Sequence, residues 1–94
     1  RLPAPVTAVP GVRLPVRVSD GGKLRVGMQA LFYQAERVVA RARVDDLASG
    51  EVQTTILQVD GNRLELAAET RVQFVAADSP VAMSAARLAS VKMR

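Results

Sequence analysis

The chain has 94 residues and a net charge of +4, enough for one small domain with one hydrophobic core. It contains no cysteine and no histidine, which excludes disulfides, thiolate metal sites and histidine-based catalysis. Aromatic residues make up only 3% of the chain, so its core must be built mainly from aliphatic side chains. No run approaches the roughly 18 apolar residues of a membrane-spanning helix.

Residues 1–11 are rich in proline, which favours an extended, unpaired backbone. We expect an arm or linker there, either without structure of its own or docked on a neighbouring subunit, and its removal should leave the remaining fold intact. The next run, 12–18, alternates apolar and polar residues, as a half-buried strand does. Because Pro15 lacks an N–H group, this strand should lie at a sheet edge.

Three further runs predict strands over 28–34, 37–47 and 51–59, separated by short turns at 35–36 and 48–50. Gly27 predicts a bulge or a tight bend before the first of them. The middle run has the clearest alternation, with apolar residues on one face and arginines on the other. A period of two is what a strand needs and a helix does not.

Asp60–Gly61 is typical of a hairpin turn, so residues 63–66 should return along the preceding strand. A last short strand is predicted over 71–75. Five or six short strands with turn residues every eight to twelve positions indicate an all-β fold. We expect a small SH3-like or OB-like barrel over residues 12–77.

Residues 78–94 change character and predict a short C-terminal helix. Ser79 is a good N-cap and Pro80 a good first helical residue. The helix should run from Pro80 to about Lys92, because apolar residues follow at helical spacing. We expect it to pack on an open end of the barrel or to dock on a partner.

Two adjacent carboxylates, Asp45 and Asp46, are the first candidate for chemistry. Neighbouring residues in a regular strand point to opposite faces, so the pair should not jointly bind a metal or share a proton. We therefore expect no metal, no cofactor and no enzymatic activity.

A basic strand face is the second candidate. Arg37, Arg41 and Arg43 should project from one side of the strand 37–47, and Leu88 and Val91 of the C-terminal helix could join them in an interface. Arginines can neutralise phosphates. Single strands of nucleic acid also need stacking aromatic rings, and the chain has only three, Phe32, Tyr33 and Phe74. A protein interface is therefore favoured over a nucleic-acid site.

The spacing Arg13-x-x-x-Arg17, followed later by Asp46-Leu47-Ala48-Ser49-Gly50, resembles the PilZ family. PilZ domains are β-barrels that bind cyclic di-GMP through an RxxxR pair and a D/N-x-S-x-x-G turn. The resemblance implies that Arg13 and Arg17 hold the phosphates and stack on guanine, with Asp46 and Ser49 at the other edge of the ligand. The turn of this chain runs D-x-x-S-G.

A second resemblance covers more of the chain. The pattern LRVGMQALFY…ERVVARARVDDL…GEVQTTI is similar to the small C-terminal barrel of the flagellar T-ring protein. The positions that carry it form the fold, so it implies a barrel and, by analogy, an assembly role. They are Leu24, Gly27, Tyr33, Val39, Ala42 and Val44.

The expected function is a non-enzymatic structural or assembly module that acts through protein–protein contacts. A composition rich in arginine, alanine and valine is typical of a GC-rich bacterial or phage genome. The expected setting is a bacterial envelope complex or a phage particle. The partners would be protein subunits, including further copies of this chain. Two alternatives stay open: a cyclic di-GMP-binding regulatory domain of the PilZ kind, and a small barrel that binds nucleic acid.

Overall fold

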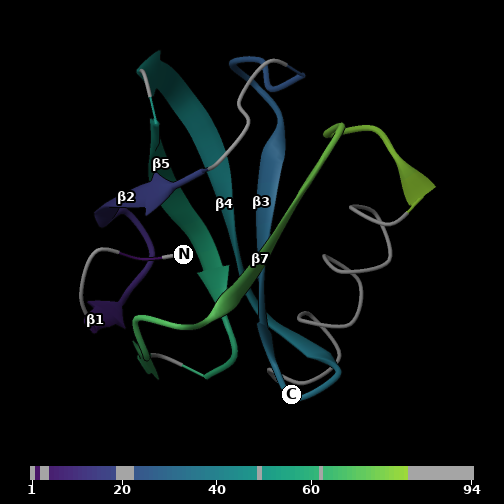
Figure 1. Cartoon of the computed structure of the whole chain (residues 1–94). Coiled ribbons are helices and arrows are strands. Elements are labelled where there is room, and N and C mark those ends of the chain that lie inside the picture. Colours follow the sequence, from purple (N-terminus) through teal and green to yellow (C-terminus); the bar gives the residue numbers. More distant parts are fainter. Residues whose placement is uncertain (1, 3–4, 19–22, 49, 62, 81–94) are drawn as a thin grey trace.

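The computed structural model describes residues 2, 5–18, 23–48, 50–61 and 63–80. Within them the chain forms two antiparallel sheets (Figure 1). The strands are β1 (Val6–Ala8), β2 (Arg13–Arg17), β3 (Gln29–Gln34), β4 (Arg37–Ala48), β5 (Glu51–Val59), β6 (Leu64–Leu66) and β7 (Arg71–Val75). The all-β prediction is therefore confirmed.

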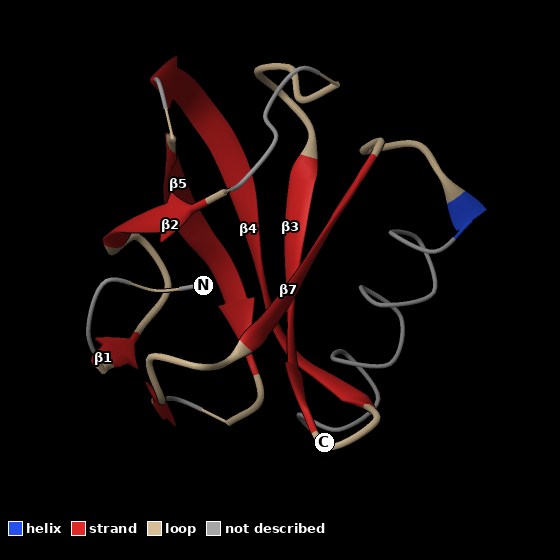
Figure 2. Ribbon diagram, in the orientation of Figure 1, coloured by secondary structure: helices blue, strands red, loops and turns tan. Residues whose placement is uncertain are grey.

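The larger sheet has five strands in the order β2-β5-β4-β3-β7 (Figure 2). The predicted strands over 12–18, 28–34, 37–47, 51–59 and 71–75 are confirmed to within one residue at each end. Turn residues explain why the strands end where they do, because Gly27 and Gly50 have the positive φ angles that glycine adopts without strain. Pro15 lies in β2, which is an edge strand as the sequence indicates.

The smaller sheet pairs β1 with β6, and this corrects the predicted hairpin at Asp60–Gly61. Gly61 does turn the chain with a positive φ, but β6 then leaves β5 and pairs with the N-terminal strand. The reason is that β5 already has β2 on one side and β4 on the other, so neither of its edges is open to a further strand. A local turn signal cannot reveal that both edges are already occupied.

The expected barrel does not close in the part of the chain that the structure describes. The five-stranded sheet ends at β2 on one side and at β7 on the other, and these two strands do not pair. Figure 1 shows β7 crossing at an angle over β3, while β1 lies below β2. The predicted helix from Pro80 to about Lys92 lies outside the described residues, apart from Pro80 itself.

The hydrophobic core lies between the two sheets and is almost entirely aliphatic, as the composition requires. Phe32, on β3, is its largest side chain and has no exposed surface. Val72 and Phe74 of β7 pack against the core from one edge of the sheet. The buried cluster consists of Leu2, Ala8, Leu14, Val16, Ala30, Phe32, Val39, Ala40, Ala42, Ile56, Val59 and Leu66.

The N-terminal segment contributes to this core, which differs from the expected arm or linker. Leu2 and Ala8 are buried, and the backbone N–H of Leu2 donates to the carbonyl oxygen of Ala68 at 3.1 Å. Thr7 donates its hydroxyl to the Glu65 carboxylate across the β1–β6 pair. Residues 6–8 are extended and pair with β6, whereas Pro10 and Gly11 form a turn that leads into β2.

Ala35, in the turn between β3 and β4, provides a stability prediction. Its φ is 56°, in the left-handed region that costs a residue with a Cβ atom about 1 kcal/mol. We expect Ala35→Gly to raise the free energy of unfolding by up to about 1 kcal/mol, because relief of strain outweighs the added freedom of the unfolded chain. Urea denaturation followed by circular dichroism measures this. Ala48→Gly is the control, and it should not raise the free energy of unfolding.

Candidate functional site

The side of the five-stranded sheet that faces away from the core is the candidate site, and we call it the outer face. Cross-strand partners share a face, so the strand register defines its members. Arginine and amide side chains dominate it. The outer face includes Arg13, Pro15, Arg17, Gln29, Tyr33, Val38, Arg41, Arg43, Asp45, Asp46, Ala48, Glu51, Gln53, Thr55, Gln58, Arg71, Gln73, Val75 and Leu31, the last of which has no exposed surface.

Only two of the three arginines predicted for this face belong to it. Arg41 and Arg43 pair with Leu31 and Gln29 of β3 and lie on the outer face. A register shift between Phe32 and Tyr33 leaves Val39 as an extra residue in β4. One extra residue reverses the alternation between the two parts of the strand on either side of it. Arg37, which precedes Val39, therefore lies on the opposite face from Arg41 and Arg43. There it forms an ion pair with Asp60.

The sheet places Arg13 of β2 on the outer face, in one row with Arg43. Arg13 of β2 lies opposite Thr55 of β5, and Thr55 lies opposite Arg43 of β4. The two arginines therefore lie in one row, separated by a single strand. The alternation of residues 12–18 predicts that Arg13 and Arg17 share a face, but only the strand order shows that β2 lies next to β5.

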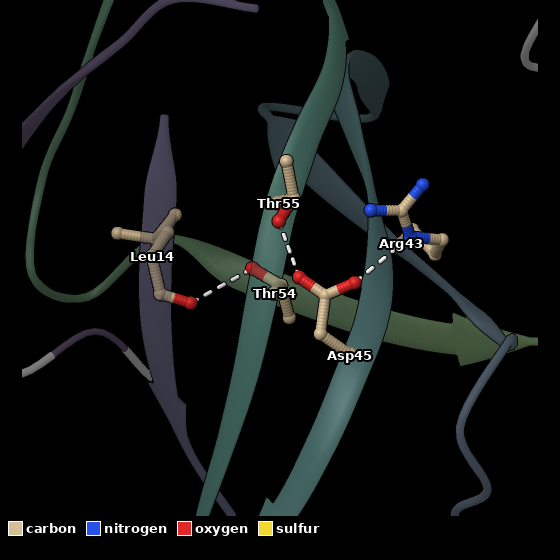
Figure 3. A network of polar contacts seen from close by, with 5 residues as sticks. All are labelled: Leu14, Arg43, Asp45, Thr54 and Thr55. Atoms are coloured by element: carbon tan, nitrogen blue, oxygen red, sulfur yellow. Dashed lines mark hydrogen bonds and ion pairs between the residues drawn. The ribbon is translucent and has the colours of Figure 1, made fainter. Parts of the chain in front are cut away.

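Asp45 joins these strands through side-chain hydrogen bonds (Figure 3). Arg43 Nε donates to Asp45 Oδ1 at 2.8 Å, and Thr55 Oγ1 donates to Asp45 Oδ2. These bonds, from Thr55 and then Arg43, hold the pKa of the Asp45 carboxyl below its ordinary value, and the charges of Arg43 and Arg13 act in the same direction. On the core side, Thr54 Oγ1 donates to the carbonyl oxygen of Leu14 at 2.8 Å.

A bulge in β4 places Asp45 on the outer face and corrects the expectation that Asp45 and Asp46 point in opposite directions. The register shifts between Val44 and Asp46, so Asp45 is the extra residue. Asp46 then pairs with Gln53, which itself pairs with Pro15. Both carboxylates therefore lie on the outer face, although Asp45 is already bonded to Arg43 and Thr55.

The lowered pKa of Asp45 predicts a pH dependence of stability. A carboxyl whose pKa is lower in the folded state stabilises the fold above its ordinary pKa, and this stabilisation is lost as pH falls through the folded value. We expect Asp45→Asn to be less stable than the parent protein at neutral pH, and the two to converge below about pH 4. Urea midpoints measured over a series of pH values test this.

Asp46→Asn is the matched control for that experiment. Among the described residues, the hydrogen bond of the Asp46 side chain is the one that it accepts from the backbone N–H of Leu47, so its replacement should leave the difference in stability between neutral and acidic pH as in the parent protein. If the stability of the parent protein exceeded that of Asp45→Asn by the same amount at every pH, the charge of Asp45 would not stabilise the fold through its bonds to Arg43 and Thr55.

Further contacts hold the other side chains of the outer face in place. Arg41 Nε donates to Gln58 Oε1 at 2.6 Å, and partial burial lowers the pKa of Arg41 without removing its charge at neutral pH. Tyr33 donates its hydroxyl to Gln73 Oε1 at 2.6 Å, and the Arg71 guanidinium lies 4.5 Å from the centre of the Tyr33 ring. The face is therefore a set of positioned polar groups.

The three aromatic rings are poorly placed for nucleic acid. Phe32 is fully buried, Phe74 packs against the core, and Arg71 covers one face of the Tyr33 ring. Single-stranded nucleic acid is normally held by rings that are free to stack on bases. None of the three rings is placed in this way.

The residues of the PilZ-like pattern are partly brought together. Arg13 and Arg17 are exposed on one face of β2, and Asp46 lies two strands away in the row of Pro15. Ser49 lies outside the described residues, as do Leu88 and Val91 of the expected interface. The charge of Arg13 acts on Asp45, so part of its field is already balanced by a carboxylate.

We expect no binding of cyclic di-GMP. The D-x-x-S-G turn does not have the D/N-x-S-x-x-G spacing of the family. The charge of Arg13 also acts on Asp45, and Arg17 lies opposite Glu51 across the β2–β5 pair. Isothermal titration calorimetry should therefore show only heat of dilution. A saturable isotherm that both Arg13→Ala and Arg17→Ala abolish, while Arg63→Ala leaves it unchanged, would contradict this expectation.

Among the described residues, no group of three or more acidic side chains is placed to hold a metal ion. The same part of the chain has no helix with the length and hydrophobicity needed to cross a membrane. Comparisons with protein-family models, with curated proteins and with solved structures found no match. The resemblances to the PilZ family and to the T-ring barrel therefore stay predictions.

Proposed function

We propose that the chain is a non-enzymatic structural and assembly module, and that its outer face is the surface to which a neighbouring protein binds. The observation that carries the proposal is the fixed position of the arginines on this face. Arg43 is held by Asp45, and Arg41 by Gln58. Side chains that are already ordered lose less conformational entropy when a partner binds, so more of the contact energy appears as affinity.

The chemistry of the outer face supports a protein partner with an acidic surface. Its charged residues are Arg13, Arg17, Arg41, Arg43 and Arg71 against Asp45, Asp46 and Glu51, so arginines outnumber carboxylates by five to three among the described residues. Arginine and tyrosine are also the residue types that most often dominate binding energy at interfaces. The expected setting is a bacterial envelope complex or a phage particle.

Site-specific photo-crosslinking tests this proposal. A photoreactive phenylalanine analogue would replace Arg43 in the chain produced in its own cells, and cross-linked proteins would be identified by mass spectrometry. We expect one or a few discrete adducts. Adding Arg13→Glu should weaken them, because it reverses a charge in the same row as position 43, two strands away.

Arg63 is the matched control position. It lies just before β6, which belongs to the smaller sheet, and its side chain is 72% exposed. The same analogue at position 63 should not give the adducts seen from position 43. Identical adducts from both positions, or none from position 43, would show that the outer face is not a specific contact surface.

A further inference from the structure

The two edges of the five-stranded sheet are not equivalent. On the β2 edge, Ile56 N–H donates to the carbonyl oxygen of Val12, and Val18 N–H donates to that of Gly50. Hydrogen-bonded residues alternate along an antiparallel pair, so the backbone groups of Arg13, Pro15 and Arg17 point outward. An edge with a proline at its centre and an arginine on each side is protected against pairing with another strand.

The β7 edge has no proline and only one arginine, Arg71, at its first residue. Val44 N–H donates to the carbonyl oxygen of Met28, so the even-numbered residues of β3 bond to β4 and the odd-numbered ones face β7. In the register of β3 and β7, this leaves the backbone groups of Val72 and Phe74 pointing away from the sheet. Within the described residues no strand pairs with them, and β7 contains neither proline nor lysine.

We propose that two copies of this chain pair through β7, antiparallel and about a two-fold axis at Gln73. In this register Val72 lies opposite Phe74 of the second copy, and Phe74 opposite its Val72. The two outward N–H groups and two outward carbonyl groups of each copy would then all be hydrogen-bonded. The two five-stranded sheets would join into one continuous sheet. This pairing rests on the proposed assembly function, and the partner is a second copy of the chain.

Self-complementarity is the reason to choose a second copy as the partner. Pairing a β-branched residue with an aromatic one is favourable across strands, and Val72 and Phe74 supply such a pair twice. Arg71 would lie opposite Val75 of the second copy and not opposite the second copy's Arg71. Four residues at about 3.3 Å each separate the two arginines along the strand by roughly 13 Å, beyond the screening length of physiological salt. Arg71 also lies over the Tyr33 ring of its own chain.

Sedimentation equilibrium of the full chain over a wide range of concentration tests the proposal. We expect a reversible shift from the monomer mass to twice that mass. Gln73→Lys and Gln73→Glu each place like charges at the two-fold axis, so each variant alone should remain a monomer. An equimolar mixture of the two variants should dimerise again, because the facing charges are then opposite.

Gln53→Lys is the matched control, a glutamine on the outer face of an inner strand, and it should dimerise like the parent chain. Circular dichroism confirms that each variant is folded. A parent chain that stays monomeric, a mixture that does not dimerise, or a control that fails to dimerise would overturn the proposal. Adducts from position 43 without dimerisation would reject the β7 pairing while leaving the proposed outer-face contact intact.

Discussion

Replacing Phe32 with alanine should destabilise the domain by about 3–5 kcal/mol, a large fraction of its total stability. The side chain is the largest in the core and is fully buried. The surrounding residues are mostly valine, alanine and leucine, which cannot move far enough to fill the space that a benzyl group leaves. A chain of 94 residues has a total stability of only ~5–14 kcal/mol.

Urea denaturation followed by circular dichroism measures the loss, and Tyr33→Phe is the matched control. Tyr33 is the next residue of β3 but lies on the outer face, where its hydroxyl donates to Gln73. Removing that hydroxyl should cost no more than about 1.5 kcal/mol. Equal losses for the two variants would mean that the core is not organised around Phe32.

Deleting residues 1–10 should abolish cooperative folding. The deletion removes Leu2 and Ala8 from the core and leaves β6 without its only partner among the described strands. Truncation of one buried leucine to alanine typically costs about 2–5 kcal/mol, and here a whole strand is lost in addition. The sequence by itself suggests the opposite result, a fold that is indifferent to the loss of a proline-rich arm.

Thermal unfolding of the truncated chain tests this, alongside two point variants. Leu2→Ala should lower the free energy of unfolding by about 2–5 kcal/mol. Pro5→Ala, at an exposed position of the same segment, should change it by no more than about 0.5 kcal/mol. A truncated chain that melts like the parent would show that the N-terminal segment does not stabilise the fold.

Local chemistry was enough to predict most of the strands. The alternation in β2 and β4, the glycines at positions 27 and 50 and the β-branched residues of β5 act within a few residues of one another. The place of β2 at a sheet edge also followed from the sequence, because a proline removes a hydrogen-bond donor wherever the strand lies.

The candidate site was only partly predictable, because three register shifts, two in β4 and one at Leu57 of β5, decide which side chains share a face. Val39 and Asp45 are extra residues in β4, and each shifts the alternation by one position. Arg37 therefore leaves the outer face and Asp45 joins it. A bulge arises from how two strands fit each other, so the sequence of β4 alone does not indicate it.

The sequence thus determined the all-β class, the strand ends and the edge position of β2, all of which depend on short-range backbone preferences. Only the tertiary structure decided the partner of β6, the burial of Leu2 and the row that joins Arg13 to Arg43. Each of these depends on which segments, distant in the sequence, find an open strand edge or an apolar surface. Such long-range pairing is governed by the packing of the whole chain and not by any local pattern.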